Sequence, residues 1–264
     1  MTISKNYGII SQKFFCFTKC ASGVDMNLLK ALKHSVCSLS RFEKILWIAS
    51  TLTVIITFLL GKEQSMLILA ATVVGVATLI FTAKGDVLGQ MLGIVFALLY
   101  ATVSFGQAYY GEVISYVFMT GGIATASVIS WLKHPYSKGV VKVGHPSKRA
   151  FACVGILAVV VTIAFYFILK FLGTANLLFS TLSILTSFIA SSLTLLRSPY
   201  YALAYALNDV ILIILWILAS LYDHSAIPMI VCFAVFLIND IYGFVNWVRL
   251  EKLQKQVQRS QEAV

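Results

Sequence analysis

The sequence predicts an all-α integral membrane protein with eight transmembrane helices: an extra N-terminal helix and a 3+1+3 core of two parallel three-helix repeats. Composition is the first observation behind this class. Of the 264 residues, 59% are hydrophobic and only 11% are charged, and the mean hydropathy is +0.91. Such a chain lacks the polar residues needed to cover a water-facing surface, so most of that surface must meet lipid. The other two observations are the apolar segments and the placement of Lys and Arg.

The apolar segments are each close to the length of about 20 residues that a helix needs to cross a bilayer. A helix is the expected structure, because every backbone amide in hydrocarbon must find its hydrogen-bond partner within its own segment. The eight predicted helices cover residues 45–60, 65–82, 87–105, 113–132, 150–169, 176–196, 199–222 and 226–248.

Lys and Arg lie almost entirely on one side of these segments. Eighteen of the 20 basic residues fall in alternate connections and in the two tails, and only Lys62 and Lys170 fall on the other side. Basic loops stay in the cytoplasm, so the pattern predicts a multi-pass protein with both termini cytoplasmic, which in a bacterium means the inner membrane. The net charge of +10 then reflects topology, and we expect no nucleic-acid partner.

Connection lengths divide the chain further. Most connections are a few residues long, whereas residues 133–149 form a long basic stretch that contains Gly and Pro, which is typical of a linker. A single crossover helix between two three-helix bundles gives both bundles the same orientation, as in parallel repeats. An offset of 116 places Trp131 on Trp247, and an offset of 112 places Tyr110 on Tyr222. The predicted parts are a tail 1–41, an extra helix 42–61, a bundle 65–132, a linker 133–149, a crossover helix 150–170, a bundle 176–249 and a tail 250–264.

Asp209 and Asp240 are the two acidic residues predicted to lie deep in the membrane. Each sits about 13 to 16 Å from the cytoplasmic boundary at about 1.5 Å per residue, which is near the bilayer centre. A charged side chain there costs about 2.5 to 3.5 kcal/mol, so it needs a function or a partner. Each follows an asparagine, Asn208 or Asn239, so two neighbouring helices carry the same dipeptide at similar depth.

Polar and aromatic residues continue along the same two helices. Their spacing of three, four and seven residues suggests one stripe per helix. The stripes comprise Tyr205, Asn208, Asp209, Leu212 and Trp216 on one helix, and Asn239, Tyr242, Gly243 and Asn246 on the next. Facing each other, they would form a pocket able to bind hydroxyls and an amide, to stack a flat ring and to balance a positive charge. The alternative is that the amides only hold the helices together.

Gln90, in the predicted third helix, could line the opposite wall of this pocket, as could Tyr116 and Thr120. Helix packing is the simpler explanation for each. The sequence contains no nucleotide-binding loop, no catalytic serine motif and no zinc-binding histidine motif, so we expect neither an enzyme nor a cofactor. The five cysteines have no metal-binding spacing, and we expect no metal site.

The segment Asn239-Asp240-Ile241-Tyr242-Gly243-Phe244-Val245-Asn246-Trp247 resembles the PnuC vitamin transporters, as does Asn208 followed by Trp216 and Tyr222. The resemblance covers about residues 65 to 250 and is to the nicotinamide riboside branch. It implies a seven-helix core similar to that of the SWEET sugar transporters, with the first helix as an addition. It also implies import of the vitamin by facilitated diffusion and trapping through phosphorylation by a cytoplasmic kinase.

Nicotinamide riboside fits the predicted pocket chemically. It is a pyridinium cation with a carboxamide and ribose hydroxyls, which match aromatic faces, amide side chains and a carboxylate. The predicted substrate-binding residues are Asn208, Asp209, Trp216, Asn239, Asp240, Tyr242, Asn246 and Gln90. Phe96 stands where the family pattern suggests a further asparagine.

Other functions stay open at this point. Asp209 and Asp240 could instead relay protons in a proton-coupled transporter, and the substrate could be a related vitamin such as thiamine. A membrane scaffold without transport activity is a third reading. The expected partners are the small-molecule substrate, membrane lipid and, by a functional link, a cytoplasmic riboside kinase. Whether the chain forms a homo-oligomer stays open.

Overall fold

The computed structural model describes residues 33–60, 65–137 and 140–262. Residues 33–40 belong to a separate unit in which residues 33–37 are helical, and the rest of the predicted tail, residues 1–32, lies outside the described residues. From residue 41 onwards, eight helices of the described chain are long and apolar enough to cross a membrane. The predicted class, an all-α membrane protein with eight spans, is confirmed.

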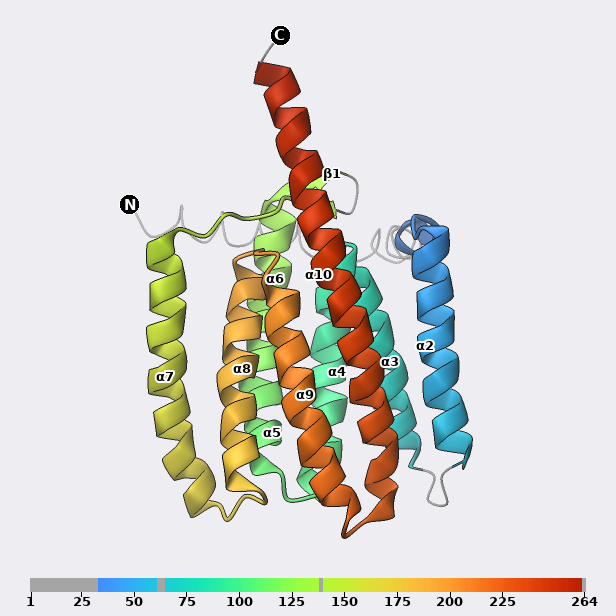
Figure 1. Ribbon diagram of the computed structural model, residues 1–264, viewed down its shortest axis with the longest axis vertical. Coiled ribbons are helices and arrows are strands. Elements are labelled where there is room, and N and C mark those ends of the chain that lie inside the picture. The colour runs from blue at the N-terminus through green and yellow to red at the C-terminus, as the bar shows by residue number, and fades with distance from the viewer. Residues whose placement is uncertain (1–32, 61–64, 138–139, 263–264) are drawn as a thin grey trace, which may run out of the picture. The chain divides into compact units, whose positions relative to one another are not determined.

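Figure 1 shows these helices side by side, with their ends at two levels. Helices dominate, and the strands form a small antiparallel hairpin. The elements are α2 (Arg41–Leu60), α3 (Met66–Ala83), α4 (Val87–Gly106), α5 (Tyr110–Ile114), the π-helix η1 (Ser115–Gly121), α6 (Gly122–Lys133), β1 (Pro135–Ser137), β2 (Val140–Val141), α7 (Lys148–Phe171), α8 (Leu177–Leu195), α9 (Tyr201–Ser220), the short 3-10 helix η2 (His224–Ala226) and α10 (Ile227–Glu262).

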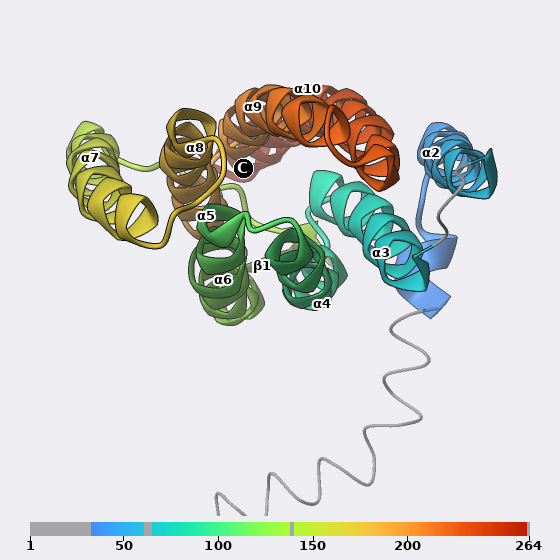
Figure 2. The ribbon, with the colours of Figure 1, turned by 90° about the horizontal axis from the view of Figure 1, so that it is seen from below.

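Six helices form a closed ring, which Figure 2 shows end-on. Around the ring α3, α4, α6, α8, α9 and α10 each contact the next, and α10 returns to α3. The two remaining spans lie outside the ring, α2 against α3 and α10, and α7 mainly against α8. Only 11% of the α7 span is buried, and its exposed residues are mostly apolar, as expected for a helix that faces lipid.

The end of the bundle that carries most Lys and Arg, called here the basic end, contains two tight turns of the same design. One joins α3 to α4 through Gly85, and the other joins α8 to α9 through Arg197, 112 residues later. Both residues have positive φ, +77° and +57°, which ends the preceding helix. The amides at and after these residues bond in the same way, Gly85 to Thr82 and Asp86 to Phe81 in one turn, Arg197 to Thr194 and Ser198 to Leu193 in the other.

Two tryptophans tie the three-helix units to each other near these turns. The ring nitrogen of Trp131, in α6, donates to the carbonyl of Thr194 at 3.1 Å, and that of Trp247, in α10, donates to the carbonyl of Thr82 at 2.9 Å. Their rings lie 5.5 Å apart. The first unit comprises α3, α4 and α5–α6, and the second comprises α8, α9 and α10. The parallel repeat stays a prediction, which these matched turns and bonds support.

Two features differ from the sequence prediction. The fourth span is not one regular helix, because its central turn is the π-helix Ser115–Gly121. The last helix does not end near residue 248 but continues to Glu262, so most of the predicted tail is helical. The extension is held by the linker, whose backbone bonds Gln254. Hydropathy could not indicate this extension, because its residues are mainly polar.

Candidate functional site

A small cavity lies inside the ring, between the two three-helix units. It is enclosed by α3 and α4, by the π-helix and α6, and by α9 and α10. Its volume is about 60 Å³, enough for water molecules but not for a nucleoside. The lining residues are Gly75, Thr78, Leu79, Thr82, Gly89, Gln90, Gly93, Phe96, Tyr116, Thr120, Ala124, Tyr201, Tyr205, Asp209, Phe236 and Asp240.

Asp209 and Asp240 face this cavity from neighbouring helices of the second unit. They are 3% and 4% exposed, and their carboxyl groups interact directly with each other. One oxygen of Asp209, Oδ2, has no hydrogen-bond partner, and neither carboxyl forms an ion pair within the described part of the chain. Buried carboxyls are costly unless they are paired or protonated, so this pair can hold a proton between its two groups or accept a cation.

Hydroxyl and amide groups surround the acid pair. The hydroxyl of Tyr205 lies 3.1 Å from Oγ of Ser191, and the amide of Gln90 donates to Oγ1 of Thr82 at 3.4 Å. Thr120 also lines the cavity, and its hydroxyl is buried without a partner among the described residues. The cavity can therefore hydrogen-bond a polyhydroxylated ligand as well as balance its charge.

Glycines form the wall opposite the acids. A Cβ added to Gly89 would lie 2.4 Å from the backbone nitrogen of Thr82, so this glycine is what allows α3 and α4 to approach so closely. Gly93, one turn further along α4, has only a side-chain carbon of Thr78 nearby, at 3.4 Å. Gly93 is therefore not needed for helix packing, and it leaves space in the cavity itself.

Aromatic layers close the cavity at both ends. Towards the basic end, Tyr201 packs on Trp247 with ring centroids 5.0 Å apart, and Trp247 packs on Trp131. Towards the opposite end, Tyr116 packs on Tyr100 at 4.1 Å, and the hydroxyl of Tyr100 accepts a hydrogen bond from Trp216 at 2.9 Å. The cavity thus lies between two layers of buried aromatic rings along the axis of the bundle.

The residues predicted from sequence to form one pocket are only partly brought together. Asp209, Asp240 and Gln90 line the cavity. Trp216 lies beyond the aromatic layer, where it borders a second cavity of about 240 Å³ at the opposite end of the bundle. The stripes on α9 and α10 therefore do not face each other along their whole length.

The three predicted asparagines bond to the protein instead. Asn208 accepts from Thr186 and Ser187 of α8, at 2.7 and 3.1 Å. Asn239 donates to Ser50 of α2 at 3.0 Å, and Asn246 donates to the carbonyl of Ala83 at 2.9 Å. These contacts match the alternative expectation, in which amides hold helices together.

Tyr242 also lies away from the cavity, because its ring packs on Phe42 of α2 at 5.2 Å. The structure in addition buries Glu112 of α5 completely, and this side chain accepts a hydrogen bond from Ser183. Sequence reasoning missed Glu112 because it stands at the start of a predicted span, where an acid normally meets water. Tyr201 was not predicted as a lining residue; it stands near the start of its predicted span, where tyrosines commonly lie at the membrane interface.

The fold and the cavity define a class: a multi-pass helical membrane protein with a central, acid-lined cavity between two three-helix units. A family model described as nicotinamide mononucleotide transporter matches residues 65–249, and the chain belongs to this family. The family predicted from sequence is confirmed, and the related proteins are transporters rather than enzymes.

Two relatives illustrate the match. The nicotinamide riboside transporter PnuC of Neisseria mucosa is 24% identical over 242 residues, which cover 89% of this chain and 92% of that protein. A crystal structure described as the vitamin B3 transporter PnuC superposes with a TM-score of 0.76 at 23% identity, and the match covers 86% of this chain and 99% of the other. The second match concerns the fold.

Proposed function

We propose that this protein carries nicotinamide riboside across the membrane by facilitated diffusion. The observation that carries the proposal is the pair of buried carboxyls, Asp209 and Asp240, in a cavity between two three-helix units. Nicotinamide riboside is a pyridinium cation, and a cation beside this pair would supply the missing charge partner. The PnuC relative, which is named as a transporter of this compound, supports the same substrate.

The remaining lining residues suit the rest of the molecule. The rings of Phe96 and Tyr116 can pack against the pyridinium, and a cation on an aromatic face is stabilised by about 0.5 to 2 kcal/mol. Gln90, Thr120 and Tyr205 offer partners for the carboxamide and the ribose hydroxyls. We therefore assign direct contact to Asp209, Asp240 and Gln90. To Asn208, Asn239, Asn246, Tyr242 and Trp216 we assign the task of holding the helices around the site.

The cavity favours the riboside over its phosphorylated form. None of the residues that line it in the described chain is Lys, Arg or His, whereas two are acidic. A phosphate carries about 1.5 to 2 negative charges at neutral pH and would meet like charge there without a cation to bind. Although the family model is described by the mononucleotide, the charge of this site supports the nucleoside as the transported species.

Transport requires the cavity to change shape. Its volume of about 60 Å³ is well below the 300 Å³ or more that is usual for ligand pockets, and both ends are closed by aromatic layers. The cycle we propose opens one layer at a time and widens the cavity around the substrate. Phosphorylation of the riboside in the cytoplasm would then prevent its return, so that no coupled ion is needed.

We further propose that the protein resides in the bacterial inner membrane with both termini in the cytoplasm. The support is the clustering of Lys and Arg at the basic end. A reporter that is active only in the cytoplasm should be active when fused to the C-terminus. A reporter that requires the periplasm should be active after Gly173. The reverse pattern would contradict the orientation.

Calorimetric titration of detergent-purified protein tests the substrate. Nicotinamide riboside should bind, the mononucleotide at least tenfold more weakly, and the uncharged reduced riboside also more weakly. Tighter binding of the mononucleotide, or of thiamine, would contradict the assignment of nicotinamide riboside as the substrate.

Proteoliposomes test the mechanism. In kinase-free vesicles the riboside should equilibrate but not accumulate when a pH gradient is imposed. Uphill uptake driven by protons would favour the alternative, in which Asp209 and Asp240 relay protons.

A further inference from the structure

The linker between the two three-helix units lies across the basic end and bonds both of them. The amide of Val141 donates to the carbonyl of Gly85, in the α3–α4 turn, at 3.0 Å. The amide of Gly144 donates to the carbonyl of Arg197, in the α8–α9 turn, at 2.9 Å. The segment 141–144 therefore joins the matching turns of the two units.

This segment also covers the aromatic layer that closes the cavity. Val141 and Val143 are 1% and 3% exposed, and they belong to one buried cluster with Trp131, Trp247 and Tyr201. Tyr201 lines the cavity itself. The linker thus packs on the same group of side chains that separates the cavity from the basic end.

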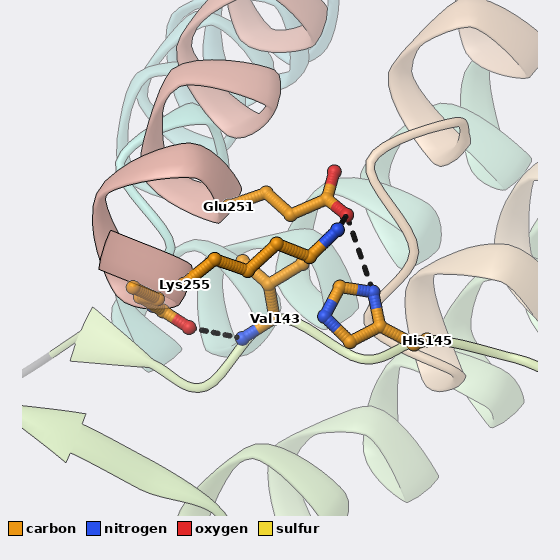
Figure 3. A network of polar contacts seen from close by, with 5 residues as sticks. Val143, His145, Glu251 and Lys255 are labelled. Carbon is orange, nitrogen blue, oxygen red and sulfur yellow. Dashed lines mark hydrogen bonds and ion pairs between the residues drawn. The ribbon is translucent and has the colours of Figure 1, made fainter. Parts of the chain in front are cut away.

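Gln254 holds the linker from the other side. It lies on the extension of α10, where most neighbours are exposed, but it is only 8% exposed itself. Its carbonyl oxygen accepts from the amide of Val143 at 2.9 Å, and its amide donates to the carbonyl of Val141 at 3.1 Å. Figure 3 shows the hydrogen bond that Val143 donates, beside the contacts of Glu251 with His145 and Lys255, at 3.2 and 2.6 Å.

The linker approaches the second unit too closely for any side chain at position 144. A Cβ on Gly144 would lie 2.2 Å from the carbonyl oxygen of Leu196. The position of the linker on the second unit therefore depends on close steric fit as well as on hydrogen bonds.

We propose that residues 141–144, clasped by Gln254, form the latch of the gate at the basic end. The proposal rests on the transport function proposed above. For a substrate to pass between the units on this side, the Tyr201–Trp247–Trp131 layer must separate. Because one segment bonds the turns of both units, that separation breaks its bonds to at least one turn. The side chain of Gln254 makes two of the hydrogen bonds that keep the segment in place.

The first test measures access to the cavity without any substrate. Ala124, which lines the cavity, is replaced by cysteine, and the rate of labelling by a water-soluble maleimide is measured in purified protein, with the unsubstituted chain as the blank. Adding Gln254→Ala should raise this rate about tenfold, the effect of losing one to two net hydrogen bonds from the closed state. Gln256→Ala, an exposed glutamine on the same helix, should leave the rate unchanged.

Equal rates in all three proteins would overturn the latch. A rise in Gln256→Ala as large as that in Gln254→Ala would overturn the specific role of Gln254. Since labelling needs no ligand, these outcomes are distinguishable from a wrong substrate assignment.

A second variant covers the case in which Gln254→Ala does not fold. The pair Val143→Cys and Gln254→Cys places one thiol on each side of this contact, and a disulfide between them, verified by the loss of free thiols, would fix the linker to α10. In proteoliposomes the oxidised protein should transport nicotinamide riboside at least tenfold more slowly than the reduced protein, while binding changes less than twofold. Transport at the same rate in both forms would overturn the proposal that the linker must leave Gln254 for the gate to open.

Discussion

The two three-helix units share the design of their turns but contribute different chemistry to the cavity. At an offset of 112 residues, Gly89 and Gly93 of α4 correspond to Tyr201 and Tyr205 of α9. At the offset of 116 that relates Trp131 to Trp247, Ala124 corresponds to Asp240. The first unit thus presents small residues where the second presents phenols and a carboxyl.

The two units therefore share the backbone geometry of their turns without sharing the side chains that line the cavity. The matched turns and tryptophans fix how the units meet, and they are nearly independent of what lines the cavity. In the proposed site, the acids of the second unit recognise the charge and the glycines of the first unit leave space for the ligand. Substitutions that remove one property at a time therefore test whether the two units have these separate roles.

The largest effect is expected at the acids of the second unit. Asp209→Asn and Asp240→Asn keep the size of the side chain but remove its charge, so affinity for nicotinamide riboside should fall about ten- to a hundredfold. The uncharged reduced riboside should lose much less, which titration of both ligands can measure. Asp223→Asn serves as control, because Asp223 accepts from Gln107 outside the cavity. Equal losses for both ligands would contradict recognition of the positive charge.

Substitutions at the two glycines of the first unit should distinguish a role in helix packing from a role in leaving space for the ligand. Gly89→Ala should lower the free energy of unfolding by about 1 to 3 kcal/mol, because its methyl group would meet the backbone of Thr82. Gly93→Ala should melt like the unsubstituted protein and weaken riboside binding, because its methyl group would occupy the cavity. Thermal unfolding in detergent and titration measure the two effects. A stable Gly89→Ala protein would show that α3 and α4 are not held in close contact there.

A smaller effect is expected at the asparagines that precede the acids. Asn208→Ala and Asn239→Ala should each lower the free energy of unfolding by about 0.6 to 1.7 kcal/mol, since each loses bonds to another helix. Riboside affinity should change less than threefold. Loss of binding without earlier melting would mean that these amides turn towards the substrate in another state of the cycle.

The smallest effect is expected at the phenol of Tyr205. Tyr205→Phe removes one hydroxyl that interacts with Ser191, so binding should weaken only about two- to fivefold, which corresponds to about 0.5 to 1 kcal/mol. Ser191→Ala removes the same interaction from the other side and is the matched variant. If Ser191→Ala binds normally while Tyr205→Phe does not, the hydroxyl contacts the substrate itself.

The sequence predicted the fold class and the family well, because both depend on properties that a linear pattern carries. Hydropathy located eight spans, the placement of Lys and Arg oriented them, and the similar depth of Asp209 and Asp240 predicted that both would belong to one pocket. The error in the predicted stripes has a simple geometric cause. Adjacent residues on a helix point about 100° apart, so with Asp209 and Asp240 in the cavity, Asn208 turns towards α8 and Asn239 towards α2.

Other features depend on contacts between segments far apart in the sequence. The extension of α10 is stabilised by the contact of its Gln254 with Val143 of the linker, 111 residues away, so no local sequence pattern predicts it. The role of Gly89 becomes visible only once α3 lies against α4. Glu112 likewise reads as an ordinary helix-start acid until Ser183, 71 residues later, is placed beside it.

The crossover helix α7 contributes nothing to the cavity, yet the second unit could not have its orientation without it. Only Ala158 and Leu169 of its 24 residues are buried. Selection should therefore act on α7 chiefly through its length and its solubility in lipid, and many apolar sequences should serve equally well there. In a comparison of divergent homologues, α7 should drift fastest in identity among the spans while its presence is never lost, since its removal would turn the acid-bearing half of the carrier upside down in the membrane.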